Sequence, residues 1–345
     1  MTAHEIEGSG LVWYDVREWG VEGRGWDDVE RYYDRLPARA KGVVRDPVWN
    51  LSKDSAGMCT CFITDAPEIH ARWRLRSARL AMSHMPATGV SGLDLYVRDE
   101  SAGVWRWLGI GRPEDSVEAQ SMLAVGLDGS RRSYLLYLPL YNGVESLEIG
   151  VPSNACFEPV APRTAKPVVF YGTSIVQGAC ASRPGMHHVA ILGRRLDCPV
   201  INLGFSGNGR MEPEVGRLLA ELDPAVYVID CLPNMSVELV SERVEPLVRA
   251  LREARPTAPI VLIGERYVHN VSLLPERRRV YAQKAEAFHK ALERLTQAGV
   301  EGFHVIPGEP LLGDDGEGTV DGSHPTDLGF WRMADVLEPV LAKLL

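Results

Sequence analysis

From residue 167 onward, short apolar runs alternate with longer segments whose apolar residues recur at helical spacing. Such runs are typical of strands covered on both sheet faces, and they lie at Val168–Tyr171, Val200–Leu203, Val226–Asp230, Ile260–Ile263 and Phe303–Ile306. The helical patterns cover Met186–Leu196, Glu212–Leu222, Val237–Arg255, Pro275–Ala298 and Thr326–Leu345. Because strand and helix alternate, this half is predicted to be a flavodoxin-like, doubly wound α/β domain with a five-stranded parallel sheet.

The preceding half has a different pattern. Its short β-rich runs are separated by Gly, Pro, Asp and Ser, and seven of the eight tryptophans lie in it. Strands are expected at Leu11–Val16, Met58–Thr64, Ile69–Leu75, Leu93–Val97, Val104–Leu108, Ser133–Leu140 and Ser146–Val151. This spacing predicts an all-β sandwich or jelly roll. The expected organisation is a sandwich domain over residues 1–155, a proline-containing linker over 156–166 and the α/β domain over 167–345.

Charge and composition exclude several classes of partner. The formal net charge is −9, which disfavours nucleic acid and anionic membranes because both require a basic surface. No run of about 18 apolar residues is present, and the first residues lack the features of a signal peptide. A cytoplasmic protein without a membrane partner is therefore expected, and a homo-oligomer is left open. The six cysteines show no zinc-site spacing and are predicted to be free thiols.

Polar and small residues follow the predicted strands, where a parallel sheet presents its ligands. The four segments are Gly172-Thr173-Ser174-Ile175, Gly204-Phe205-Ser206-Gly207-Asn208-Gly209, Cys231-Leu232-Pro233-Asn234-Met235 and, before the last helix, Asp321-Gly322-Ser323-His324-Pro325. Together they supply a nucleophile, oxyanion donors, a base and a group that orients the base.

These segments resemble the SGNH (GDSL-type) hydrolases over residues 165–345. The four residues that name the family match Ser174, Gly204, Asn234 and His324, and Asp321-x-x-His324 matches the final family motif. The sequence of these segments resembles one branch of the family, in which a β-sandwich precedes the hydrolase domain. Relatives of that kind include carbohydrate acetyl esterases and acyltransferases of natural-product pathways. The chain departs from the common family pattern at three positions, which are Thr173, Leu232 and Met235.

The resemblance implies acyl transfer without a cofactor or metal. Ser174 is expected to be the nucleophile, His324 its general base and Asp321 the residue that orients His324. The backbone N–H groups of Ser174 and Gly204 and the side-chain amide of Asn234 are expected to form the oxyanion hole. Gly204 is expected to lack a side chain because its backbone approaches the substrate.

Substrate contacts are predicted from polar residues in loops near this site. They are Gln177, Arg183, Asn208, Arg210 and Glu265, with Arg266 beside them. Such groups suit a hydroxyl-rich substrate better than a long acyl chain. The chain is therefore predicted to be a serine esterase that removes short acyl groups, with acetyl expected, from a carbohydrate or small hydroxylated compound.

Two other functions remain open on these grounds. An acyltransferase would pass the acyl group from Ser174 to a hydroxyl acceptor instead of water. A sugar-binding protein with a relic hydrolase domain would use aromatic residues of the N-terminal half, namely Trp73, Tyr96, Trp105 and Trp107. The competing structural interpretation makes Ser174 a helix cap and Asn234 and Asp321 turn residues. A metal site at His187 and His188 is disfavoured because adjacent helical residues point to different faces.

Overall fold

The protein, described by a computed structural model over residues 3–5 and 10–345, folds into two compact units. The first contains the chain up to Ala38, Ser52–Thr164 and Ser182–Gly185. The second contains Arg39–Leu51, Ala165–Ala181 and Met186–Leu345. Each unit thus includes a short segment from the other half of the sequence. Residues 156–166, for which the sequence indicates a linker, include strand β10.

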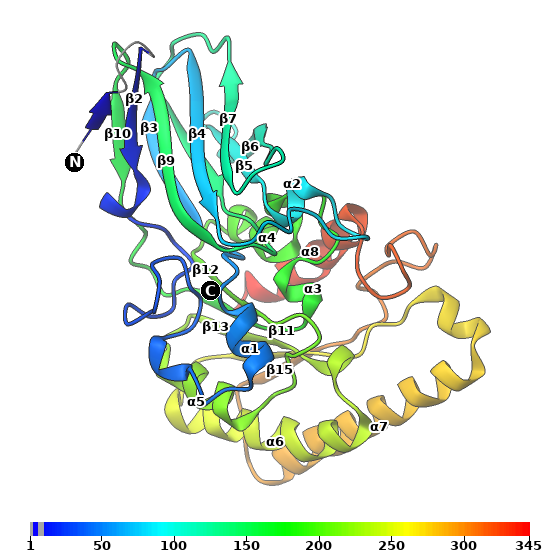
Figure 1. Ribbon diagram of the computed structural model, residues 1–345. Coiled ribbons are helices and arrows are strands. Elements are labelled where there is room, and N and C mark those ends of the chain that lie inside the picture. Colours follow the sequence, from blue (N-terminus) through cyan, green and yellow to red (C-terminus); the bar gives the residue numbers. More distant parts are fainter. Residues whose placement is uncertain (1–2, 6–9) are drawn as a thin grey trace. The chain divides into compact units, whose positions relative to one another are not determined.

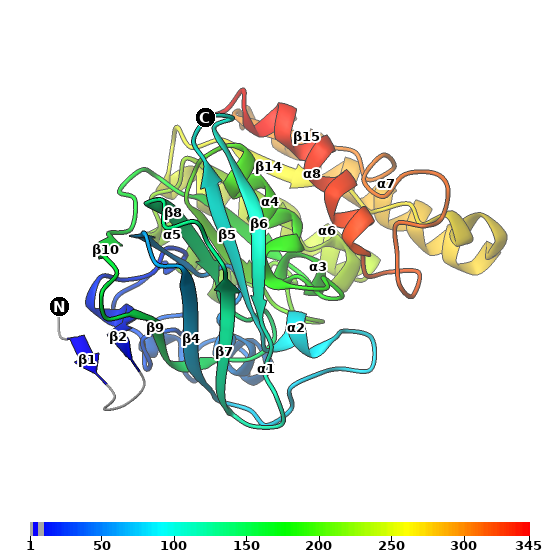
Figure 2. The same cartoon turned by 90° about the horizontal axis from the view of Figure 1, so that it is seen from above.

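The first unit is a sandwich of two five-stranded antiparallel sheets, as predicted. Their strand orders are β1-β2-β9-β4-β7 and β10-β3-β8-β5-β6. Successive strands from β2 to β9 alternate between the sheets except for β5 and β6, which run side by side (Figure 2), and this is a jelly-roll arrangement. The strands are β1 (Ala3–Glu5), β2 (Leu11–Asp15), β3 (Cys59–Thr64), β4 (Glu68–Leu75), β5 (Leu93–Asp99), β6 (Val104–Gly111), β7 (Glu118–Val125), β8 (Arg132–Tyr137), β9 (Val144–Pro152) and β10 (Phe157–Val160).

Alternating side chains of both sheets form the sandwich core. On β4, every second residue from Ile69 to Leu75 is buried, as expected for a strand with one covered face. Trp73 and Tyr96, two of the aromatic residues considered for sugar stacking, are buried, whereas Trp107 is half-exposed and donates its indole N–H to Asp94. The sequence did not indicate β7, because its inward-facing positions include small residues that weaken the alternation.

The second unit is built on a five-stranded parallel sheet of order β12-β11-β13-β14-β15. This is the flavodoxin-like order predicted from the sequence, and its topological switch point is beside β11. The strands are β11 (Val168–Gly172), β12 (Val200–Gly204), β13 (Val226–Asp230), β14 (Ile260–Ile263) and β15 (Phe303–Ile306). The first four are fully buried, including the edge strand β12, whereas the other edge strand, β15, exposes His304 and Val305.

Helices cover both faces of this sheet (Figure 1). Helices α4 and α8 pack together on one face, while α5, α6 and α7 contact one another in order on the other. The helices of this unit are α1 (Asp46–Leu51), α3 (Ser174–Gln177), α4 (His188–Arg195), α5 (Pro213–Glu221), α6 (Val237–Ala254), α7 (Pro275–Gln297) and α8 (Asp327–Leu341). A further short helix, α2 (Ala87–Val90), belongs to the first unit.

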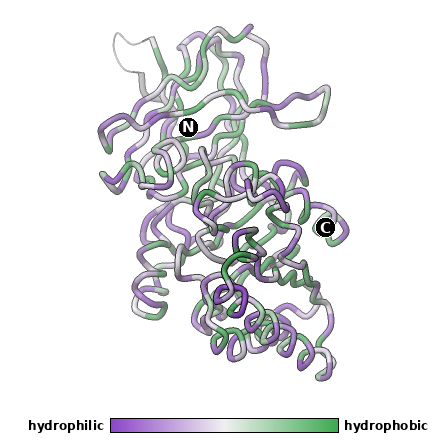
Figure 3. The backbone as a smooth tube through the Cα atoms, turned by 90° about the vertical axis from the view of Figure 1, so that its right-hand side faces the viewer, coloured by the Kyte–Doolittle hydropathy of each residue, from purple (hydrophilic) through white to green (hydrophobic). Residues whose placement is uncertain are grey.

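The amphipathic pattern of the long helices explains their position. On α6, Ser236 caps the first turn by accepting a hydrogen bond from Leu239 N, and the buried residues are Val240, Val244, Leu247, Val248 and Leu251. Figure 3 shows green and purple stretches alternating along the helices at the bottom of the view. The predicted helices are present; α4 begins two residues later than expected because Pro184–Met186 forms a 3-10 turn, and α8 ends at Leu341.

Helix α4 carries a histidine inside the core. His188 is buried, and its ring stacks on that of Phe330 from α8 at a centroid distance of 5.7 Å. Burial, together with His187 and Arg266, holds the pKa of His188 well below the usual 6.5, so the imidazole stays neutral. All six cysteines are free thiols, as predicted. Within the described residues, no helix combines the length and apolar character needed to span a membrane.

Candidate active site

Ser174 is the first residue of α3, directly after β11 and therefore at the topological switch point of the sheet. The preceding Thr173 caps this short helix, and its hydroxyl accepts a hydrogen bond from Ile175 N at 3.2 Å. Gly178 ends the helix with φ +107°, a conformation that favours glycine. The Ser174 side chain is thus fixed at the carboxyl end of a buried strand, with 7% of the residue exposed.

Ser174, His324 and Asp321 form a hydrogen-bonded series. The Ser174 Oγ lies 2.9 Å from His324 Nε2, and His324 Nδ1 lies 2.7 Å from Asp321 Oδ2. The other Asp321 oxygen accepts hydrogen bonds from the backbone N–H groups of Ser323 and His324, which fixes the loop before α8. Burial raises the pKa of Asp321, but these hydrogen bonds outweigh that effect and the net pKa is below its usual value. The Asp321 carboxylate is therefore charged at neutral pH.

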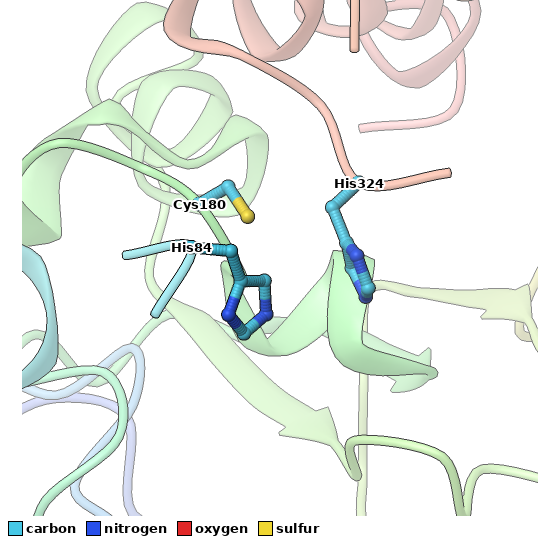
Figure 4. A group of neighbouring side chains, drawn as sticks. All are labelled: His84, Cys180 and His324. Carbon is cyan, nitrogen blue, oxygen red and sulfur yellow. The ribbon is translucent and has the colours of Figure 1, made fainter. Parts of the chain in front are cut away.

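A free thiol lies near this series. Cys180 Sγ is within 4.8 Å of a ring nitrogen of His324, and Figure 4 shows both side chains. Burial and the negative charge of Asp321 raise the pKa of Cys180 to about 12. Since the thiolate is the nucleophilic form, Cys180 is a poor nucleophile at neutral pH.

The loop after β12 contains five consecutive backbone N–H groups next to α3. Four of them donate to protein acceptors at 2.8–3.0 Å, and these belong to Phe205, Ser206, Asn208 and Gly209. The N–H of Gly207 donates to no group in the part of the chain that the structure describes. Gly207 has φ +68°, and the space where a Cβ would lie is open. Gly207 is therefore the residue of this loop whose N–H is available to a ligand.

Gly204 does not have the surroundings expected from the sequence. Its N–H donates to Asn202 Oδ1 at 2.9 Å. A Cβ at position 204 would lie 2.1 Å from the backbone nitrogen of Gln177 in α3. Gly204 thus lacks a side chain because helix α3 packs against it, not because its backbone approaches a substrate, and its predicted role as an oxyanion donor requires revision.

Asn234 lies in a 3-10 turn, Leu232–Asn234, directly after β13. Its side-chain nitrogen Nδ2 is buried and donates to no group among the described residues. A buried donor without an acceptor costs about 1–3 kcal/mol, and most proteins avoid one. Asn234 therefore has a buried N–H donor that is available to a ligand. It lies after β13, which is next to β11, the strand that precedes Ser174.

Three of the predicted substrate contacts are occupied within the α/β unit. Gln177 is fully buried, and its Oε1 accepts the N–H of Ser206. Asn208 accepts a hydrogen bond from Arg45 Nη1 at 2.9 Å. Arg210 donates from Nε and Nη2 to the carbonyl oxygen of Gly207 at 3.1 and 2.8 Å. These side chains shape the loop around Gly207, and the hydrogen bonds give each of them a structural role.

Arg183 was predicted to lie at the rim of the α/β unit, but the structure places it in the first unit. Its Nη1 donates to Asp94 Oδ2 at 2.8 Å and to the Tyr96 hydroxyl at 2.5 Å. Its guanidinium also lies over the ring of Trp107, 5.1 Å from the centroid. The sequence could not indicate this, because Asp94 is 89 residues away along the chain.

Glu265 borders a cavity of about 330 Å³ next to the loop that carries His324. We call it the α7 cavity, and it is lined by Pro233, Glu265, Tyr281, Lys284, Gly322 and Ser323, with three further residues of α7. The Glu265 carboxylate forms an ion pair with Lys284, and both side chains are almost fully buried. The neighbouring Arg266 is instead used in a buried ion pair with Asp230. Glu265 is thus the predicted substrate residue that lines a cavity beside the site.

Sequence reasoning missed a network that holds the Gly207 loop. Arg45 comes from the Arg39–Leu51 segment, which belongs to the α/β unit. It forms an ion pair with the buried Glu212 and donates to the Asn208 carbonyl oxygen at 3.1 Å. Glu212 also accepts hydrogen bonds from the Tyr171 hydroxyl and from Arg210 N. Nothing in the sequence pattern connects residues that lie 167 positions apart.

Comparisons with known proteins agree with this architecture. Residues 165–342 match the family model of the GDSL-like lipases/acylhydrolases, and residues 11–157 match that of the N-terminus of SGNH-hydrolase-type esterases. The chain is similar to the crystal structure of a GDSL-like lipase from Bacteroides ovatus, with 34% identity, a TM-score of 0.91 and coverage of 97% of this chain and 98% of that chain. No curated protein has a matching sequence.

Two more distant structures share the fold. A salicylyl-acyltransferase from a tetracycline biosynthetic pathway is 18% identical, with a TM-score of 0.74 and coverage of 99% of this chain and 97% of that chain. A family two carbohydrate esterase from Cellvibrio japonicus is 11% identical, with a TM-score of 0.61 and coverage of 97% and 98%.

Proposed function

Because the chain belongs to the GDSL-like lipase/acylhydrolase family and is a carboxylic ester hydrolase, we propose that it removes a short acyl group, acetyl above all, from a carbohydrate or another small hydroxylated compound. The observation that carries the proposal is the hydrogen-bonded series of Ser174, His324 and Asp321 at the switch point of the sheet. A serine hydroxyl next to an imidazole that is held by a carboxylate is the arrangement that acyl transfer requires.

In the proposed first step, Ser174 Oγ attacks the ester carbonyl carbon while His324 Nε2 takes the hydroxyl proton. The Oγ–C bond forms, and the negatively charged Asp321 stabilises the imidazolium through Nδ1. The C–O bond to the alcohol then breaks as the His324 imidazolium protonates the leaving oxygen. In the second step, a water molecule attacks acyl-Ser174 with His324 again as the base, which releases the carboxylic acid and restores the Ser174 hydroxyl.

We assign the oxyanion donors to the backbone N–H groups of Ser174 and Gly207 and to Asn234 Nδ2. Gly207 replaces Gly204 in this assignment, because the N–H of Gly204 is already bonded to Asn202. The Gly207 N–H and Asn234 Nδ2 lack acceptors among the described groups, and they follow β12 and β13, the two strands on either side of β11. Donors held in place before the reaction stabilise the developing oxyanion without reorganisation.

The substrate class is supported by the α7 cavity. Its charged and hydroxyl-bearing residues, among them Glu265, Lys284, Tyr281 and Ser323, can exchange hydrogen bonds with sugar hydroxyls, whereas an aliphatic chain would leave them unpaired. Several structures of similar fold are named as carbohydrate esterases. At their level of identity these likenesses concern the fold alone, so the substrate class is our proposal.

The proposal is tested with p-nitrophenyl acetate, butyrate and octanoate in the presence of EDTA. Wild type should hydrolyse acetate fastest, and Ser174→Ala should lose at least about three orders of magnitude in kcat. Ser241→Ala, a change of an exposed serine on α6, serves as the matched control and should leave the rate unchanged. Equal slow rates for wild type and Ser174→Ala would overturn the proposal.

A second candidate is acyl transfer to a hydroxyl acceptor, which the name of one structural neighbour motivates. The same acyl-Ser174 would form, and the acceptor hydroxyl would replace water in the second step. The two functions are separated by product analysis at a fixed ester concentration while the acceptor alcohol is varied. If the acylated acceptor replaces free acid as the main product at millimolar acceptor, transfer is favoured. If free acid dominates throughout, hydrolysis is favoured.

A further inference from the structure

The α7 cavity contains an unbalanced positive charge. Glu265 and Lys284 form a buried ion pair and neutralise each other. Glu276 is held by Arg279, whose Nε and Nη2 donate to its carboxylate at 3.1 and 2.5 Å. Arg277 also lines the cavity, and no carboxylate among the described residues pairs with it. The other charged groups that line the cavity are thus accounted for, whereas the guanidinium of Arg277 is available.

This guanidinium lies next to the proposed catalytic loop. Arg277 Nη1 is 3.8 Å from the position that a Cβ on Gly322 would occupy. Gly322 and Ser323 separate Asp321 from His324 and both border the cavity, as does Pro233, the chain neighbour of Asn234. A group bound by Arg277 would therefore lie beside the loop that carries His324 and the turn that carries Asn234.

We propose that the α7 cavity binds the alcohol part of the ester and that Arg277 recognises a carboxylate on it, so that the preferred substrates are acylated sugar acids. This inference rests on the proposed esterase function. His324 protonates the leaving alcohol in that mechanism, which places the alcohol on the side of the cavity that Ser323 borders. A guanidinium forms paired hydrogen bonds with a carboxylate, and its single positive charge matches one carboxylate better than a phosphate monoester of nearly two charges.

The remaining lining residues suit the hydroxyls of such a compound. The Glu265 carboxylate accepts hydrogen bonds and the Lys284 ammonium donates them. Burial and the nearby Glu265 raise the pKa of Tyr281, an effect that Arg277 opposes in part, so the phenol stays protonated and can donate. The cavity volume of about 330 Å³ is at the lower end of the range for small-molecule sites, roughly 300–1,000 Å³, which favours a single sugar ring over a polymer segment.

The test compares two esters that differ in charge only. They are fully O-acetylated methyl glucuronoside and its uncharged amide, and acetate release is measured for wild type, Arg277→Gln and Arg278→Gln. Wild type should prefer the carboxylate by roughly tenfold in kcat/KM, a magnitude expected for one solvent-accessible charged hydrogen bond. Arg277→Gln should abolish this preference. Arg278→Gln, one position along α7 and outside the cavity lining, should keep it.

The possible outcomes test the role of Arg277 separately from the proposed esterase function. If wild type hydrolyses p-nitrophenyl acetate but has equal kcat/KM on the carboxylate and the amide, the role of Arg277 is overturned and the esterase proposal stays intact. Persistence of the preference in Arg277→Gln would also overturn it. If wild type does not hydrolyse p-nitrophenyl acetate, the esterase proposal is instead refuted. Urea unfolding, compared with that of wild type, shows whether Arg277→Gln is folded.

Discussion

Replacing Asn234 with alanine should change activity and stability in different directions. The variant removes one proposed oxyanion donor, and the loss of such a donor costs about 10²–10³ in kcat, or roughly 2.7–4 kcal/mol of transition-state stabilisation. In the resting protein, however, Asn234 Nδ2 is buried and bonded to no described group. The substitution therefore removes an unpaired donor rather than a hydrogen bond.

The expected change in stability follows from that difference. An unpaired buried donor destabilises a fold by about 1–3 kcal/mol, and the loss of side-chain packing at a partly exposed residue offsets part of the relief. The free energy of unfolding of Asn234→Ala should thus be unchanged or higher by about 1 kcal/mol. A similar truncation at a fully bonded asparagine should have the opposite result.

Asn142→Ala provides that comparison. The Asn142 side chain is buried and makes hydrogen bonds to Ser77 N, Ser77 O and Ser91 Oγ at 2.8–3.1 Å. Its removal should cost about 2–3 kcal/mol and leave kcat of the folded protein unaltered. Urea unfolding gives the stabilities and p-nitrophenyl acetate hydrolysis gives kcat. If Asn234→Ala lost as much stability as Asn142→Ala, or less than about fivefold in kcat, the reasoning on Asn234 would be refuted.

Three further predictions concern other described contacts. Gly204→Ala should destabilise the fold by about 3 kcal/mol in urea unfolding, because its Cβ would lie 2.1 Å from the backbone nitrogen of Gln177, and wild-type stability would contradict this. Between pH 7.5 and 5.5, the free energy of unfolding of wild type should fall by about 1.4 kcal/mol more than that of His188→Phe, because His188 takes up a proton in the unfolded state but stays neutral when it is buried. Equal pH slopes for the two proteins would contradict this. At pH 8, iodoacetamide followed by mass spectrometry should find exposed Cys156 labelled and Cys180 protected, because the pKa of Cys180 is raised to about 12, and comparable labelling rates would refute this.

The elements that could be predicted from the sequence depend on local patterns. Buried parallel strands are continuous apolar runs, and groups that follow them must gather at one sheet edge, so the positions of Ser174, Asn234 and His324 could be predicted from the sequence alone. The choice between Gly204 and Gly207 could not be made in this way. It depends on which N–H is already bonded, and the acceptor that decides it is the side chain of Asn202.

Contacts between residues far apart in the sequence also could not be predicted. Gln177 has the polar side chain expected of a substrate contact, yet it is buried, and its Oε1 accepts the N–H of Ser206 from the loop after β12. Arg183 has the same polar character, and its partner Asp94 belongs to a different structural unit from the predicted site. A polar side chain near a motif indicates that the site is polar, but the partner that occupies the side chain is set by tertiary structure.

The Arg39–Leu51 segment has a consequence for the evolution of this chain. A gene cut near residue 165 would preserve Ser174, Asp321 and His324 and would look like a complete catalytic module. It would nevertheless leave the Glu212 carboxylate buried without the guanidinium of Arg45, and because Arg45 is itself partly exposed, the loss of this ion pair costs about 1–3 kcal/mol. Recombination with a different N-terminal domain would therefore succeed only if that domain brought its own cation for Glu212, so the two halves are expected to be inherited together.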